Sequence, residues 1–217
     1  MQIEIPIFPL PNVVWFPHTY LPLHVFELRY RQMVEDCLCG DRRMAVVRLK
    51  EGWEKDYYGR PPVHRIAAAG KIIRANRVPD GRFHILLLGE ERIAIAGEIP
   101  KDRLYRVARA WVLSDHRSEG TTLNRVVDEL KRAAGRFLLE LNRPPIHLFH
   151  VLGSGAKAGV IVDRMASALV SDPDQRQRLL DTLELRERAG LLLEYLERLR
   201  NQGRQSADPY ARRAQMN

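Results

Sequence analysis

The feature that most constrains the fold is an uncharged, proline-rich segment near the N-terminus. Residues 8–26, FPLPNVVWFPHTYLPLHVF, contain no Asp, Glu, Lys or Arg. Four of these residues are prolines, and a proline inside a helix removes a backbone donor and clashes with the preceding turn. The segment therefore cannot form the apolar helix of about 20 residues that crosses a bilayer. We expect it to be extended chain that is buried in the fold.

Composition and cysteine usage indicate a cytoplasmic globular protein of a bacterial type. Of the 217 residues, 45% are hydrophobic and 29% are charged, so the chain can form one large domain or two small ones. It lacks the basic N-terminal region of a signal peptide, and no segment approaches a membrane span. Cys37 and Cys39 are one residue apart. A disulfide between them would be strained, so free thiols are predicted.

The net charge of +8 is spread evenly along the chain. Residues 1–116 carry 18 Lys and Arg against 14 Asp and Glu, and residues 117–217 carry 17 against 13. A basic protein attracts nucleic acids and acidic partners. An evenly spread excess, however, is more typical of an ordinary solvated surface.

Short apolar segments separated by tight turns predict strands in the first half of the chain. Residues 79–81, Pro-Asp-Gly, suit a β-turn because proline sets the first φ and glycine supplies a positive φ. Residues 89–91, Gly-Glu-Glu, are interpreted as a second turn. One helix is predicted from Phe26 to Gly40, where apolar residues recur at helical spacing. The predicted strands cover residues 44–49, 65–78, 82–88, 92–99 and 104–113.

After residue 114 the apolar residues recur with the period of a helix. This pattern predicts helices over residues 123–141 and 160–169, and residues 171–174, Ser-Asp-Pro-Asp, resemble the capped start of another. The predicted fold class is α+β, with an antiparallel sheet or small barrel, one inserted helix and a C-terminal helical part. The domains are expected at residues 1–116 and 117–203, with a disordered tail at residues 204–217.

No segment has the residues of a catalytic, metal or cofactor site. Residues 153–159, GSGAKAG, invite comparison with a phosphate-binding loop, but Ala158 stands where the magnesium-binding hydroxyl belongs. The segment is therefore interpreted as a connection between helices. His147 and His150 have helical spacing, yet no acidic residue nearby completes a metal site. We predict no catalytic residue, no metal and no cofactor.

A polar loop between two predicted strands carries three aromatic residues. The loop covers residues 50–62, KEGWEKDYYGRPP, and its aromatic residues are Trp53, Tyr57 and Tyr58. These residues either cover the barrel end as a lid or contact a partner, because Trp and Tyr give contact area at a low entropic cost. Both interpretations remain open from the sequence. The three aromatic residues are the predicted binding residues.

The N-terminal segment resembles the opening signature of the Lon protease N-terminal domain family. The positions that match this signature are Phe8-Pro9-Leu10, Phe16-Pro17, Pro22-Leu23, Phe26-Glu27 and Arg29-Tyr30. Positions that resemble the family's later glycines and turn are Gly70, Asp80-Gly81-Arg82, Gly89 and Arg92. The resemblance covers nearly the whole chain to about residue 200.

The sequence departs from the family pattern at three positions of that region. Trp15 stands where an aliphatic residue is common, His18 where glycine is common, and Ile93 where phenylalanine is usual. We expect these departures to change packing and surface more than fold.

The resemblance implies a PUA-like β-barrel followed by a helical bundle, with structural roles for most signature residues. Glu27 and Arg92 are expected to form a partly buried ion pair between the helix and the barrel. A full Lon protease also carries an ATPase module and a protease domain, and this chain ends before either could begin. A stand-alone member is therefore expected. The residues expected to pack the barrel against its helix are Phe8, Leu10, Phe16, Leu23, Phe26 and Tyr30.

Three functions follow from these observations. The resemblance implies a non-enzymatic module that binds unfolded or tagged polypeptides, or a protease or adaptor, without hydrolysing them. RNA binding is the alternative, because PUA-like barrels resemble RNA-binding modules and the chain is basic. An ATP-dependent peptidase is disfavoured, because neither nucleotide-binding nor nucleophile motifs are visible.

Overall fold

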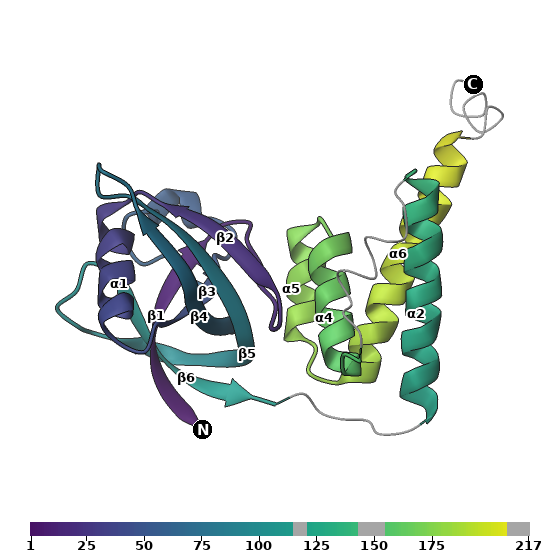
Figure 1. Cartoon of the computed structure of the whole chain (residues 1–217), viewed down its shortest axis with the longest axis horizontal. Coiled ribbons are helices and arrows are strands. Elements are labelled where there is room, and N and C mark those ends of the chain that lie inside the picture. The colour runs from purple at the N-terminus through teal and green to yellow at the C-terminus, as the bar shows by residue number, and fades with distance from the viewer. Residues whose placement is uncertain (115–120, 143–154, 208–217) are drawn as a thin grey trace. The chain divides into compact units, whose positions relative to one another are not determined.

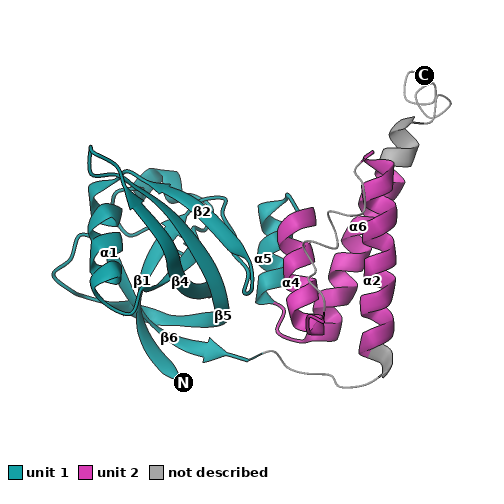
Figure 2. Ribbon diagram, in the orientation of Figure 1, with its two compact units in different colours: residues 1–114, 170–181 teal, residues 115–169, 182–217 magenta. Residues whose placement is uncertain are grey.

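The computed structural model describes residues 1–114, 121–142 and 155–207 (Figure 1). The chain divides into two compact units, which are coloured separately in Figure 2. The sheet unit comprises Met1–Ser114 and Val170–Asp181, and the helical unit comprises Asp115–Leu169 and Thr182–Asn217. Residues 170–181, which the sequence pattern assigns to the helical domain, group with the sheet unit in the structure.

The sheet unit is built on six strands in the hydrogen-bonded order β2-β5-β4-β3-β1-β6. β5 also pairs with β6, so five strands form a closed ring of pairings and β2 is attached to β5 outside it. β5 can serve both neighbours because its first half pairs with β2 and its second half with β6. The strands are β1 (Gln2–Leu10), β2 (Tyr20–Val25), β3 (Arg43–Arg48), β4 (Ile66–Arg77), β5 (Phe83–Ile99) and β6 (Arg106–Leu113).

One pairing in the ring is parallel, whereas the sequence analysis predicted an antiparallel barrel. β1 and β3 run in the same direction, with Ile7 opposite Ala45 and Leu10 opposite Arg48. A parallel pair needs a crossover connection, and helix α1 (Leu28–Cys39) lies in the chain that joins these two strands. The other strand pairings are antiparallel.

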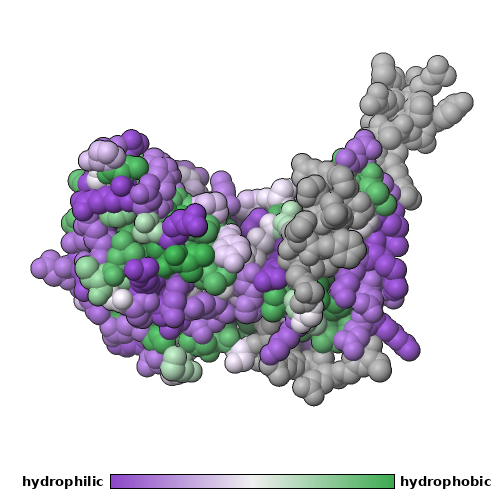
Figure 3. Space-filling view, in the orientation of Figure 1, coloured by the Kyte–Doolittle hydropathy of each residue, from purple (hydrophilic) through white to green (hydrophobic). Residues whose placement is uncertain are grey.

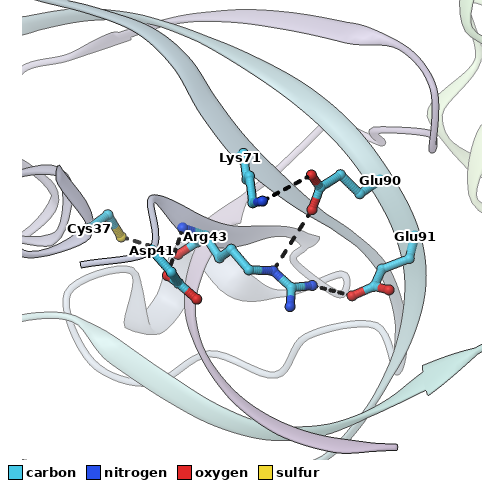
Figure 4. Close-up of polar contacts among 6 residues, drawn as sticks. All are labelled: Cys37, Asp41, Arg43, Lys71, Glu90 and Glu91. Carbon is cyan, nitrogen blue, oxygen red and sulfur yellow. Dashed lines mark hydrogen bonds and ion pairs between the residues drawn. The ribbon is translucent and has the colours of Figure 1, made fainter.

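The second predicted turn, at residues 89–91, is wrong, because these residues lie inside the continuous strand β5. The pairing of β5 with β4 shifts register here, which leaves Glu90 as the extra residue of a β-bulge. Cross-strand ion pairs hold the two acidic side chains on the sheet (Figure 4). Arg43 of β3 pairs with Glu90 and Glu91, and Lys71 of β4 lies 3.7 Å from Glu90. Glycine followed by two acids thus marks a bulge, not a chain reversal.

The proline-rich segment is extended and largely buried. It forms the end of β1, a loop and the whole of β2, and the loop residues Trp15 and Phe16 are almost completely buried. The loop passes over the point where Gly70 of β4 and Gly89 of β5 lie opposite each other. A β-carbon on Gly89 would lie 2.3 Å from the Phe16 carbonyl oxygen, so only glycine permits this approach. In the same loop His18 has a φ of 61°, the conformation that glycine adopts most easily.

Hydrophobic residues form two clusters that use opposite faces of the strands. One cluster joins the strands to α1, which lies beside them in Figure 1. The second cluster uses the alternate residues of the same strands, because successive side chains of a strand point to opposite faces. Ile7, for example, belongs to the second cluster and its neighbour Phe8 to the first. The helix residues of the first cluster are Tyr30, Met33, Val34 and Cys37.

Both cysteines are free, and they differ in accessibility. Cys37 is buried and its Sγ donates to the carbonyl oxygen of Arg43 at 3.3 Å, whereas Cys39 is exposed (Figure 4). Burial, helped by the charges of Asp41 and Asp36, raises the pKa of Cys37 to about 12. Its thiol therefore stays protonated at neutral and mildly alkaline pH.

We therefore expect iodoacetamide at pH 8 to modify Cys39 rapidly in the native protein and Cys37 only after denaturation. The thiolate is the reactive form of cysteine, and a buried thiol is also shielded from the reagent. Mass spectrometry of the alkylated peptides measures both rates. A Cys39→Ser variant isolates the buried thiol, and rapid native modification of that variant would contradict the burial of Cys37.

The described part of the helical unit consists of three helices, two of which are joined by a buried ion pair. The guanidinium Nε of Arg188 on α6 lies 3.2 Å from Oδ1 of Asp163 on α4, and both side chains are almost completely buried. Arg188 also donates from Nη1 to the carbonyl oxygen of Thr182 at 2.7 Å. The helices are α2 (Thr121–Glu140), α4 (Ala158–Leu169) and α6 (Leu185–Ala207). α6 thus extends into the predicted tail, whose residues 208–217 lie outside the described residues.

Helix α5 (Pro173–Asp181) begins where the sequence predicted a helix and belongs to the sheet unit. Its cap is Asp172, whose Oδ1 accepts hydrogen bonds from the next two available backbone N–H groups. Polar contacts then hold the helix to the strands and to the proline-rich loop. Arg48 of β3 pairs with Asp174 at 2.7 Å, and Gln177 donates to the carbonyl oxygen of Ile66 at 3.0 Å.

Candidate functional site

The aromatic loop, residues 50–62, is closed at its base between β3 and β4. The N–H of Lys50 donates to the carbonyl oxygen of Pro62 at 2.9 Å. Inside the loop, the short 3-10 helix η1 (Trp53–Asp56) follows Gly52, which has a φ of 82°. These local bonds give the loop a defined conformation.

The rings of the three loop aromatics are in contact, with Tyr57 touching both of the others. The ring of Tyr57 packs edge-on against Trp53, with centroids 5.5 Å apart, and against Tyr58, with centroids 5.1 Å apart. Trp53 and Tyr57 are half-buried, whereas Tyr58 is exposed. Tyr57 therefore faces the fold, whereas Tyr58 faces solvent.

Glu27, at the start of α1, links the helix to this loop. Its Oε1 accepts a hydrogen bond from the Tyr57 hydroxyl at 2.5 Å, and its Oε2 lies 3.0 Å from Nε of Arg29. The Arg29 guanidinium also lies 5.0 Å from the ring centroid of Tyr57 and 5.9 Å from that of Tyr58. Glu27, Arg29, Trp53, Tyr57 and Tyr58 are called the loop cluster below.

The electrostatics of the loop cluster favour this arrangement at neutral pH. Burial and the adjacent Glu27 carboxylate both raise the pKa of Tyr57. The phenol therefore remains a hydrogen-bond donor, and the carboxylate of Glu27 is shared between this phenol and the Arg29 guanidinium.

The predicted ion pair between Glu27 and Arg92 is not formed. Glu27 contacts Tyr57 and Arg29, while Arg92 of β5 donates from Nε to the carbonyl oxygen of Leu180 on α5, at 3.2 Å. From the sequence, α5 is predicted to lie in the helical domain, so this acceptor for Arg92 is not expected there.

Three apolar side chains next to the Glu27–Tyr57 hydrogen bond are exposed. Phe26 and Leu28 flank Glu27 and are 59% and 69% exposed, and Tyr58 follows Tyr57 and is 87% exposed. We call Phe26, Leu28 and Tyr58 the exposed trio. Phe26 was expected to pack inside the fold, but the buried face of α1 begins only at Tyr30.

The other residues with predicted structural roles lie in the interior or at its border. Phe8, Phe16 and Tyr30 are buried, and Leu10 and Leu23 are partly buried against the cluster that joins the strands to α1. Hydrophobic side chains are also exposed elsewhere on the sheet unit, as the green surface in Figure 3 shows. Tyr20 on β2 and Ile73 on β4 are among the exposed large hydrophobic residues.

The described residues contain no group of three or more His, Cys, Asp or Glu side chains that could hold a metal ion. His147, His150 and the first part of the glycine-rich segment 153–159 lie outside the described residues. Within the described ranges, no helix combines the length and apolar character that crossing a bilayer requires.

Comparison with known proteins identifies the family. The family model for the ATP-dependent protease La (LON) substrate-binding domain matches residues 4–198, which is most of the chain. The chain belongs to this Lon substrate-binding domain family. The family resemblance of the N-terminal signature is thereby confirmed.

Individual relatives of this Lon domain are similar over most of the chain. The Lon protease of Roseiflexus castenholzii is 32% identical over 201 residues, covering 90% of this chain and 24% of the relative. The Lon protease of Desulfosudis oleivorans is 24% identical over 190 residues, covering 85% of this chain and 22% of the relative. The chain thus spans about a quarter of the length of the curated relatives it matches.

Solved Lon domains share the fold. The N-terminal domain of a Mycobacterium avium complex Lon protease has a TM-score of 0.72 at 14% identity, covering 90% of this chain and 98% of that one. A Lon N-terminal domain protein from Xanthomonas campestris has a TM-score of 0.61 at 23% identity, covering 89% and 98%.

The aromatic residues of the candidate site are marked in the sequence, whereas the contacts of Glu27 and Arg29 with them are not. Both are signature positions, and Glu27 was expected to pair with Arg92; nothing in the sequence connects either residue with a loop almost 30 residues later. Leu28 carried no signal, because an apolar residue in the first turn of a helix is ordinarily assumed to be buried.

Proposed function

We propose that this Lon domain binds unfolded polypeptide segments, without hydrolysing them, through the exposed trio at the loop cluster. The observation that carries the proposal is the exposure of three apolar side chains around one hydrogen-bonded link. Exposed apolar groups of this kind mark interaction sites, and aromatic residues on a rigid support are typical anchors. The family's description as a substrate-binding domain supports a polypeptide as the occupant.

The loop cluster suits this role because its two halves have different tasks. Tyr57 is held by Glu27 and Arg29, so the backbone that carries Tyr58 is fixed before a ligand arrives. A preorganised support lowers the entropic cost of binding. Apolar contacts without directional hydrogen bonds tolerate many sequences, which suits a receptor for unfolded chains.

The alternative, RNA binding, gains no support from the loop cluster. Recognition of single-stranded RNA needs stacking rings beside cations that are available to phosphates. Among the described residues, Arg29 is the one cation that contacts these rings, and one cation does not form the positively charged groove that tracks an RNA backbone. The PUA-like character of the strand ring, a cytoplasmic location, and a protease or adaptor as second partner remain proposals that rest on the family resemblance.

Binding of a fluorescently labelled, permanently unfolded casein tests the proposal by anisotropy. We expect a Kd of tens of micromolar or tighter, and a loss of about tenfold or more in a Phe26→Ser/Tyr58→Ser variant. Each aromatic side chain removed from an apolar contact costs on the order of 1.5 kcal/mol, and 1.4 kcal/mol is tenfold in affinity.

Tyr20→Ser is the matched control, because Tyr20 is similarly exposed but lies at the far end of β2, roughly 20 Å from Phe26. The control is expected to bind as the wild type does. Absence of binding by the folded wild type would overturn the proposed function. An equal loss of affinity in Tyr20→Ser and in Phe26→Ser/Tyr58→Ser would overturn the placement of the site.

A further inference from the structure

A small cavity lies beside the loop cluster, within the sheet unit. Its volume is about 10 Å³, close to the space that one water molecule needs. Tyr57 forms part of its wall, and the next residue in the chain is the exposed Tyr58. The other walls include Arg29, Tyr30, Arg106, Pro9 and Pro61.

Two donors belong to residues that line this cavity. The Nη2 atom of Arg29 is buried and has no hydrogen-bond partner among the described residues. Tyr30 also lines the cavity, and with a side chain only 5% exposed it brings a phenol hydroxyl as the second donor. Burial raises the pKa of Tyr30 to about 12, against the nearby positive charges of Arg29 and Arg106, so the phenol remains a donor.

The guanidinium groups in the cavity wall are each paired with a carboxylate. Arg106 donates from Nε to Glu98 at 3.1 Å. Arg29 pairs with Glu27 through Nε, which leaves its buried Nη2 without an acceptor among the described residues. A buried guanidinium N–H without an acceptor favours an anionic acceptor.

We propose that this cavity receives a carboxylate oxygen of the bound polypeptide, with Arg29 Nη2 and the Tyr30 hydroxyl as donors. The inference deepens the proposed function and rests on it. A carboxylate oxygen is about as large as a water molecule, and hydrogen bonds from a guanidinium to a carboxylate are charge-assisted. The carboxylate fixes the position of the chain while its apolar side chains contact the exposed trio. It comes either from the C-terminus or from an Asp or Glu side chain.

Three labelled peptides with the same apolar sequence test this inference by anisotropy at one ionic strength. The first ends in a free carboxylate, the second in an amide, and the third is amidated but contains one glutamate. Tyr30→Phe removes only the hydroxyl at the cavity. Tyr105→Phe is the matched control, because Tyr105 is equally buried in the same unit but donates to Asp36, at 2.7 Å.

We expect the wild type to bind the first or the third peptide about tenfold more tightly than the neutral peptide. The peptide that shows the gain identifies the source of the carboxylate. Tyr30→Phe should reduce the gain to about threefold or less, and Tyr105→Phe should keep it. Equal binding of all three peptides, or an unchanged gain in Tyr30→Phe, would overturn the carboxylate site while leaving the proposed function intact. Loss of binding to every peptide would overturn the proposed function itself.

Discussion

Replacement of Gly89 by alanine is expected to lower the free energy of unfolding of the sheet unit by roughly 3 kcal/mol, at the upper end of overpacking effects. The added β-carbon would lie 2.3 Å from the carbonyl oxygen of Phe16 and 3.1 Å from the α-carbon of Pro17. These are backbone atoms, so a side-chain rotation cannot relieve the clash. Urea denaturation followed by tryptophan fluorescence measures the effect, because Trp15 is buried at the same crossing.

Gly97→Ala is the matched control for this substitution. Gly97 lies in the same strand, β5, and a β-carbon there would meet no atom within 4 Å. Its replacement should change the free energy of unfolding by less than about 1 kcal/mol, the ordinary difference between glycine and alanine in regular structure. Equal stabilities of the two variants would show that the loop does not cross β5 as closely as described.

Replacement of Asp163 by asparagine is expected to destabilise the helical unit by about 3–5 kcal/mol. The change preserves the shape of the side chain but leaves the Arg188 guanidinium buried without its counter-charge, which is the costly situation for a buried ion pair. Thermal unfolding followed by circular dichroism at a helical wavelength measures the loss, because α4 and α6 contribute much of the helical signal.

Two further variants separate the buried charge from other effects. Glu140→Gln removes one partner of the Glu140–Arg200 pair between α2 and α6, which is partly exposed, and should cost less than about 1 kcal/mol. A double variant, Asp163→Leu with Arg188→Met, removes both buried charges and should recover most of the stability lost by Asp163→Asn. If Asp163→Leu/Arg188→Met were less stable than Asp163→Asn, the unpaired charge of Arg188 would not be the cause of the destabilisation.

Elements whose signals lie within a few neighbouring residues could be predicted from the sequence. The turn at residues 79–81 forms with Gly81 at a φ of 81°, and α5 begins behind the Asp172 cap as expected. The buried face of α1 also follows the predicted helical spacing. In each case, the residues that determine the local backbone are adjacent or one helical turn apart.

Predictions failed where two distant segments had to be brought together. Residues 89–91 look like a turn, yet Arg43 and Lys71 from other strands neutralise Glu90 and Glu91 within a bulged strand. Arg92 was assigned to Glu27 because no local pattern shows that α5 returns to the sheet unit. Both errors concern partners chosen by tertiary packing.

The candidate site likewise combines residues that the sequence pattern indicates with contacts that only the fold shows. Trp53, Tyr57 and Tyr58 stood out because three aromatic residues are unusual in a charged loop. Only the fold shows that Tyr57 is fixed by Glu27 and that Phe26, Leu28 and Tyr58, the chain neighbours of these two residues, are exposed. The cavity had no signal in the sequence, since its donors Arg29 and Tyr30 lie on α1 while its other walls, such as Pro9 and Arg106, come from distant segments.

The sequence by itself determined the family, the extended path of the proline-rich segment and the alternation of strands and helices. Backbone restrictions at proline and glycine, and the spacing of apolar residues, act over a few positions and can be read directly. The tertiary structure alone decided the parallel pairing of β1 with β3, the return of α5 and the partners of the buried charges. Those features depend on which groups, distant in the sequence, come into contact in the folded chain. Only the groups that come into contact are shielded from water.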